Sequence, residues 1–527
     1  MSPIQKAVAA ALIASAATSA NAIDISQYAA DNAAGKVVNV YVGGSTAVNV
    51  ALFESAMHTT VSGIAALCNA STGAIDLYTD AADTKNPHAQ WMVYCYANSS
   101  LGLSSPATEI AFFKESELGS QNGSIPLYNN AINGQNSQTL LFINPADLAD
   151  SNCVTPTTGT LGGAQAYTVH QSCSFTTYTP AVNITGGVSD VEGPLVGASA
   201  SLISKYLTGK PGLAPVWAVP VNNTFYRALQ VGQGLSGNTA SGVPSLTHAQ
   251  LAAIMTGDEP SGNLFVNDSG AIAFPDAATT NFAICRREFG SGTEASAELF
   301  WLGEGCGSSD LAVPAENQFG TPASAAPAVI EETSTGNIAG CLEAFDGSGN
   351  VTDYLGSVYA TGGPRPAIGI ISSENGASTF ALGPTTPVSG SGGVGVLAVD
   401  GALPTLENVV NGYYPFFSED LLYNITSTAF YTGNPAKVWN AVKNNIGAPG
   451  FLADSNKAFI NYWGISGDLS PPSIYGTPTT IPATEASVEA SPLNALSKST
   501  NAAGTPNNCD PAVVYGTTTP TYQYLNQ

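Results

Sequence analysis

A run of seven residues, Arg287 to Thr293, carries the side chains best suited to hold an oxyanion. It reads Arg-Glu-Phe-Gly-Ser-Gly-Thr and joins a strand-like segment at 281–285 to a helix-like segment at 294–301. The glycines let the main chain approach a ligand closely. The N–H groups at the helix start, the Ser291 and Thr293 hydroxyls and the Arg287 guanidinium all donate hydrogen bonds. The run indicates a site for a tetrahedral oxyanion, although a turn with a surface arginine is an alternative that it leaves open.

A second strand-to-helix turn lies near the start of the chain. The β-branched run at 36–42 ends at Gly43-Gly44-Ser45-Thr46, and apolar residues at helical spacing follow from 48 to 57. Farther along, Thr247 and Gln250 form a capping box for a helix that should end at Gly257. Strands alternating with helices predict an α/β fold with mostly parallel sheets. Polar stretches at 60–108, 126–180 and 305–345 look like elaborations of it.

These motifs, in this order, resemble the periplasmic phosphate-binding proteins of ABC importers, a branch of the type II solute-binding fold. Gly43 to Thr46 resembles the first anion loop of that family, and Arg287 to Thr293 matches its Arg-x-x-Gly-Ser-Gly-Thr signature. The resemblance spans about 36–425. It is also carried by residues 187–190 (Gly-Val-Ser-Asp), 245–257, 367–370 (Ala-Ile-Gly-Ile), 403–409 and 412–415.

The resemblance implies the residues that would bind the anion. Two positions depart from the family pattern: Ala47 stands where an aromatic residue is usual, and Phe289 where many members carry aspartate beside the arginine. A further family serine corresponds to Ser120, and Ser116 and Ser124 lie close to it in the sequence. The implied ligands are Ser45, Thr46, Ser120, Asp190, Arg287, Ser291, Gly292 and Thr293.

The family fold implies two α/β lobes, with loop-rich insertions and an extended C-terminal segment. Lobe 1 would comprise 23–215 and 413–527, and lobe 2 would comprise 216–412. The chain would cross between them near 214–222 and 400–412. The anion would lie in the cleft between the lobes, where ligands bind at topological switch points of open α/β sheets.

Composition restricts the partners. The 527 residues carry 14 Lys and Arg against 38 Asp and Glu, a formal net charge of −24, which repels nucleic acid and anionic membrane surfaces. Residues 1–22 have the pattern of a secretory signal peptide, with Ala20-Asn21-Ala22 as the cleavage site. We therefore expect a periplasmic or secreted protein that is not inserted in a membrane.

Eight cysteines in an exported chain predict disulfides. Their spacing suggests Cys68–Cys95, Cys153–Cys173 and Cys285–Cys306, and elimination then leaves Cys341–Cys509, although eight cysteines allow 105 connectivities. The histidines show no regular zinc-site spacing. The expected protein has neither a metal nor another cofactor.

The function that the resemblance implies is capture of phosphate or a related tetrahedral oxyanion without catalysis, with an ABC permease as a possible partner. The main alternative is an extracellular surface or matrix protein that kept the fold and modified or lost the anion site. A secreted phosphatase is a further alternative, but it needs a metal cluster or an activated nucleophile, and neither is found in the sequence.

Overall fold

The computed structural model describes most of the chain, and the predicted signal peptide at 1–22 lies outside the described part. Among the described residues, no helix is both long enough and apolar enough to cross a membrane. The described ranges are 23–58, 64–71, 73–80, 90–133, 140–148, 152–154, 156–161, 165–174, 178–179, 182–259, 261, 281–303, 306, 313–319, 321, 327–347, 349–375, 379–382, 393–476, 484–499 and 505–515.

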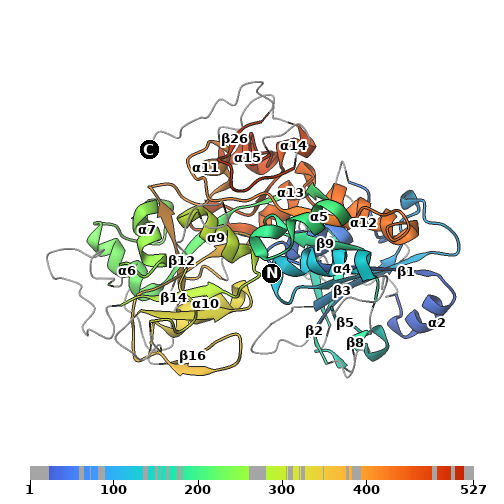
Figure 1. The fold of residues 1–527 in the computed structure, drawn as a ribbon, viewed down its shortest axis with the longest axis horizontal. Coiled ribbons are helices and arrows are strands. Elements are labelled where there is room, and N and C mark those ends of the chain that lie inside the picture. Colours follow the sequence, from blue (N-terminus) through green and yellow to red (C-terminus); the bar gives the residue numbers. More distant parts are fainter. Residues whose placement is uncertain are drawn as a thin grey trace, which may run out of the picture.

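The molecule has two lobes, each built on its own sheet, and a C-terminal segment that lies over their junction (Figure 1). The lobe 1 sheet has nine strands in the order β10-β21-β9-β1-β4-β3-β2-β7-β6. Their bounds are β1 (Val37–Gly44), β2 (Asp76–Asp80), β3 (Gln90–Tyr96), β4 (Glu109–Glu115), β6 (Thr157–Leu161), β7 (Gln165–Cys173), β9 (Gly186–Ser189), β10 (Leu207–Pro211) and β21 (Leu421–Ile425).

Alternation along β1 gives lobe 1 a core on each face of its sheet. Val38, Val40 and Val42 belong to one buried cluster, and Val37 belongs to the other. The first cluster is covered by α3 (Asn49–Met57), α12 (Gly433–Asn445) and α13 (Pro449–Ser455), and α4 (Ile125–Asn133) and α5 (Ala200–Tyr206) pack on the second.

Lobe 2 repeats this layered arrangement around a smaller sheet, in which β14 lies between β15 and β18 with both pairings parallel. The predicted capping box of Thr247 and Gln250 is present, and its helix ends before Gly257, as predicted. The strands are β12 (Trp217–Asn222), β13 (Ser245–Leu246), β14 (Ala283–Arg287), β15 (Ala328–Glu332), β18 (Ala367–Gly369), β19 (Ile371–Ser372) and β20 (Val394–Val399). The helices are α6 (Asn223–Gly232), α7 (His248–Met255), α9 (Gly292–Leu302) and α10 (Thr335–Ala344).

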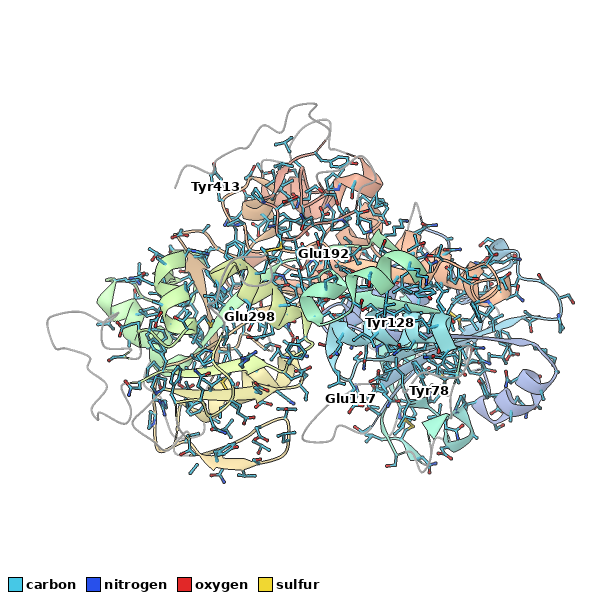
Figure 2. The ribbon with its side chains drawn as sticks, viewed as in Figure 1. Tyr78, Glu117, Tyr128, Glu192, Glu298 and Tyr413 are labelled. Carbon is cyan, nitrogen blue, oxygen red and sulfur yellow. A yellow bond between two sulfur atoms is a disulfide. The ribbon has the colours of Figure 1, made fainter. Side chains whose placement is uncertain are left out.

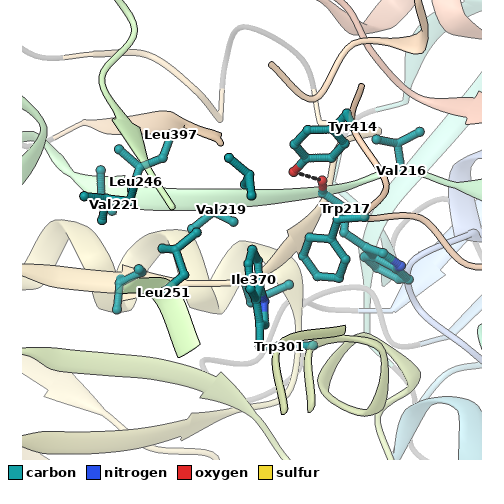
Figure 3. Packing of buried hydrophobic residues seen from close by; sticks show 14 of the residues in the cluster. Val216, Trp217, Val219, Val221, Leu246, Leu251, Trp301, Ile370, Leu397 and Tyr414 are labelled. Carbon is teal, nitrogen blue, oxygen red and sulfur yellow. Dashed lines mark hydrogen bonds between the residues drawn. The ribbon is translucent and has the colours of Figure 1, made fainter. Parts of the chain in front are cut away.

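Two segments that cross between the lobes pair with each other and form the hinge. The Asp420 N–H donates to the Leu213 carbonyl at 3.0 Å, and the Trp217 N–H donates to the Phe416 carbonyl at 3.1 Å. Trp217 is fully buried, and its carbonyl accepts a hydrogen bond from the Tyr414 hydroxyl at 2.7 Å (Figure 3). The hinge is therefore part of a hydrophobic core.

The C-terminal segment contacts the hinge and both lobes. The Asn508 N–H donates to Glu192 of lobe 1 at 2.6 Å, and the Asn508 side chain donates to the Glu419 carbonyl of the hinge at 3.1 Å. Figure 2 shows Glu192 beneath this segment, near the middle of the molecule. A disulfide joins Cys509 to Cys306, which follows α9 of lobe 2. The segment thus ties three parts of the molecule together.

Two of the four predicted disulfides are wrong. Cys68–Cys95 and Cys153–Cys173 form as predicted, but Cys285 pairs with Cys341 and Cys306 with Cys509. The reason is spatial. Cys285 lies in β14, against which α10 packs with Cys341, whereas α9 carries Cys306 away toward the C-terminal segment. Closeness in sequence therefore misled the assignment.

The sheets are mixed, whereas the sequence analysis predicts mostly parallel ones. Strands β4 and β9 run parallel to β1, but β3 and β21 are antiparallel to their neighbours. One cause is the hinge: β10 leads out of lobe 1 and β21 leads back, so the two run in opposite directions. The polar stretches at 60–108, 126–180 and 305–345, which the sequence analysis interprets as elaborations, also supply β2, β3, β7 and β15. These strands belong to the two main sheets.

The Cys306–Cys509 link gives a stability prediction. Replacing both cysteines with serine should lower the free energy of unfolding by about 2–4 kcal/mol, because the cross-link restricts an unfolded chain across a sequence separation of 203 residues. Urea denaturation measures the loss. Peptide mapping without reduction is the independent check, and a peptide that joins Cys285 to Cys306 would contradict the structure.

Candidate functional site

The predicted site residues follow strand ends where the two lobes meet. Ser45 and Thr46 follow β1, Asp190 follows β9, and Ser291 to Thr293 follow β14, which ends at Arg287. Strands β1 and β9 are parallel, so their carboxyl ends lie at the same edge of the lobe 1 sheet. Lobe 1 thus presents Ser45, Thr46 and Asp190 at one edge, opposite the β14 turn of lobe 2.

Asp190 is the centre of this group. Its buried carboxylate accepts hydrogen bonds from the Ser45 hydroxyl and, at 3.1 Å, from the Ser120 hydroxyl. The Asp190 N–H donates to the Ser120 oxygen at 3.0 Å. Burial raises the pKa of Asp190, while the two hydroxyl donors and the charges of Arg287 and Lys114 act in the opposite direction.

Gly292 brings lobe 2 against this carboxylate. A Cβ atom on Gly292 would overlap the Ser120 hydroxyl and lie 2.6 Å from Asp190 Oδ2. Nearby, the Gln121 N–H of lobe 1 donates to the Gly290 carbonyl of lobe 2 at 2.9 Å. The lobes are therefore closed on each other at the site, and the absence of a side chain at Gly292 permits the contact.

Arg287 makes a second contact between the lobes. Its Nη1 donates to the Thr46 hydroxyl at 3.2 Å, while Nε and Nη2 donate to both oxygens of Glu288 at 3.0 and 3.1 Å. Its Nη2 also donates to the Thr333 carbonyl at 2.6 Å. Glu288 is thus the acidic partner of Arg287, whereas the neighbouring Phe289 is 70% exposed.

The first turn of α9 offers unused donors. Ser291 is its N-cap residue, but the Ser291 side chain caps no N–H group there, and the first N–H groups of a helix have no acceptor within it. Thr293 is buried, and its hydroxyl has no hydrogen-bond partner among the described residues. An anion at this helix start would receive hydrogen bonds from both kinds of donor.

Lys114 is a residue of this region that the sequence analysis missed. It lies in β4, fully buried, and its ammonium donates to the carbonyls of Gly44 and Ser45 at 2.6 and 3.0 Å. Burial lowers its pKa to about 7, against the opposing charges of Glu115 and Asp190. Lys114 therefore fixes the backbone of the turn that carries Ser45 and Thr46. A lysine at the end of an apolar strand is the signal that could have revealed it.

A cavity of about 540 Å³ opens between the lobes beside this group. Of the eight predicted residues, only Thr46 lines the cavity among the described residues. Aromatic side chains of lobe 1 form much of one wall, and polar residues of lobe 2 form the other. The predicted site residues themselves are packed against one another at its edge.

Comparison with known proteins gives structural likeness but no sequence match. No family model and no curated protein matches the chain. A structure described as a phosphate ABC transporter substrate-binding protein with bound phosphate, from Clostridium perfringens, is 14% identical, covers 82% of this chain and 99% of its own, and has a TM-score of 0.36.

Two further structures are similar to the chain at comparably low identity. PstS from Borrelia burgdorferi is 11% identical over 81% of this chain and 98% of its own, with a TM-score of 0.31. An ABC-type phosphate transport receptor from Vibrio cholerae is 17% identical over 54% of this chain and 80% of its own, with a TM-score of 0.27.

Proposed function

We propose that this protein captures phosphate or a related tetrahedral oxyanion between its lobes, without catalysis. The observation that carries the proposal is the convergence of hydrogen-bond donors from both lobes around Asp190. Lobe 1 contributes the Ser45, Thr46 and Ser120 hydroxyls. Lobe 2 contributes Arg287 and the first turn of α9, with Ser291, Gly292 and Thr293.

The mechanism is a shift in a hinge equilibrium. Rotation about the paired crossing segments separates Gly292 from Asp190 and opens the site to solvent. An anion that binds donors of both lobes stabilises the closed arrangement relative to the open one, because the open arrangement offers it only half of these donors. Binding thus requires no chemical step.

The proposal includes the division of the chain into lobe 1 (23–215 and 413–527) and lobe 2 (216–412). It also includes an exported location, with cleavage after Ala22. An ABC permease is the partner that capture for import would require.

Arg287 gives the first test. Replacing it with alanine should weaken phosphate binding by about 1.5–3 kcal/mol, because a charged donor leaves a desolvated site. Calorimetric titration of refolded, ligand-free protein measures this. Arg286→Ala is the matched control, since Arg286 bonds to the Val313 and Pro314 carbonyls and pairs with Glu294. Flat titrations of folded wild-type protein, or equal losses in the two variants, would contradict the proposal.

Asp190 gives a test of selectivity. Its carboxylate can accept a hydrogen bond from protonated phosphate but not from fully ionised sulfate. Asp190→Asn adds a donor and removes the repelling charge, so this variant should retain some phosphate binding and gain sulfate affinity. Sulfate competition at neutral pH measures the ratio. An unchanged phosphate-to-sulfate ratio would place Asp190 outside the anion site.

Gly292 tests closure. Gly292→Ala should cost about 1–3 kcal/mol in the closed form alone, because the added methyl group overlaps Ser120 and Asp190 of the opposite lobe. Phosphate affinity should fall, and small-angle scattering should report a more open molecule. Gly340→Ala is the control, because a Cβ there meets nothing within 4 Å. Equal behaviour of the two variants would refute closure through this contact.

A further inference from the structure

The cavity between the lobes has features that inorganic phosphate would not use. Its volume of about 540 Å³ exceeds what a phosphate ion fills. Phe53, Trp91 and Tyr167 contribute aromatic surface from lobe 1, and Phe53 packs edge-to-face on Trp91 with ring centroids 5.9 Å apart. An apolar wall of this kind suits an organic group.

The opposite wall is acidic. Glu374 is the one charged residue among the described residues that line the cavity. Its side chain is 7% exposed, and Oε2 has no hydrogen-bond partner within the described part of the chain. A buried carboxylate in this setting is costly unless a cation or a proton compensates it.

The surroundings strengthen the preference for a cation. Burial raises the pKa of Glu374 well above its usual value, and the charges of Asp468, Asp190 and Glu54 raise it further. Both carboxylate oxygens of Asp468 are also buried and lack partners among the described residues. A cation bound beside Glu374 would offset these effects and favour its ionised form. Aromatic side chains and a carboxylate lining one cavity are the kinds of group with which proteins bind quaternary ammonium ions.

Thr46 connects this cavity to the anion site. It lines the cavity, and its hydroxyl accepts the hydrogen bond from Arg287. We propose that the ligand is an organic phosphate ester that carries a quaternary ammonium group, with the ammonium between the aromatic wall and Glu374 and the phosphate at the oxyanion site. This inference rests on the proposed function and names the class of ligand for it.

The test uses two phosphate esters that differ in one atom. Phosphocholine carries the ammonium, and neohexyl phosphate has a carbon atom in place of that nitrogen. Calorimetric titration of the full protein should give phosphocholine an affinity about tenfold or more above that of neohexyl phosphate. Glu374→Gln should bring this ratio close to one, because phosphocholine loses its counter-charge and neohexyl phosphate no longer faces a buried carboxylate. Tyr167→Leu should lower the ratio as well.

The outcomes separate the two proposals. If inorganic phosphate binds but the two esters bind equally, or if the preference for phosphocholine survives in Glu374→Gln, the ammonium site is wrong and phosphate capture stands. If neither phosphate nor either ester binds folded wild-type protein, both proposals fail. If phosphocholine binds with the same affinity in wild type and Arg287→Ala, its phosphate is not at the oxyanion site and the inference is overturned.

Discussion

Antiparallel pairing of the two crossing segments sets how the lobe 1 and lobe 2 residues of the candidate site face each other. The hydrogen bonds of Leu213 with Asp420 and of Trp217 with Phe416 fix the two segments side by side. Asp420 adds further bonds, because its carboxylate accepts from the N–H groups of Gly212 and Leu213. Since both lobes leave from this pair, a shift in its register would move Gly292 away from Asp190.

The C-terminal region stiffens this hinge. Strand β24 (Asp468–Leu469) pairs with β11 (Ala214–Pro215), so a third segment adds to the crossing pair. The Glu419 carboxylate accepts hydrogen bonds from the Ser497 and Ser499 hydroxyls, which fasten the next part of the tail. With Cys509 bonded to lobe 2 and Asn508 hydrogen-bonded to Glu192 of lobe 1, this region links the two lobes.

The sequence predicts well what depends on neighbouring residues. The strand-to-helix turns at Gly43 and Gly290 and the Thr247 capping box are local, and each forms as predicted. The disulfide of Cys285 depends on how α10 packs on β14, and the partner of Arg287 depends on side-chain direction at Glu288. Such features depend on tertiary packing, which the identities of neighbouring residues in the sequence do not determine. The buried roles of Lys114 and Glu374 fall in the same group.

The distribution of charged groups would link the proposed capture of an anion to the choice among ligands. Most of the net charge of −24 can act on a buried site only through solvent, where exposed charges are screened beyond about 8 Å at physiological ionic strength. Glu288 balances the charge of Arg287, so hydroxyls and N–H groups in a desolvated place, where such dipoles act strongly, would have to share with Arg287 the stabilisation of a bound anion. Solvent ions screen the buried carboxyl groups of Asp190 and Glu374 much less. An anion without a proton to donate would leave the Asp190 carboxylate uncompensated. A ligand without a cation would leave the Glu374 carboxylate uncompensated. The two buried carboxyl groups would thus select opposite ends of the ligand.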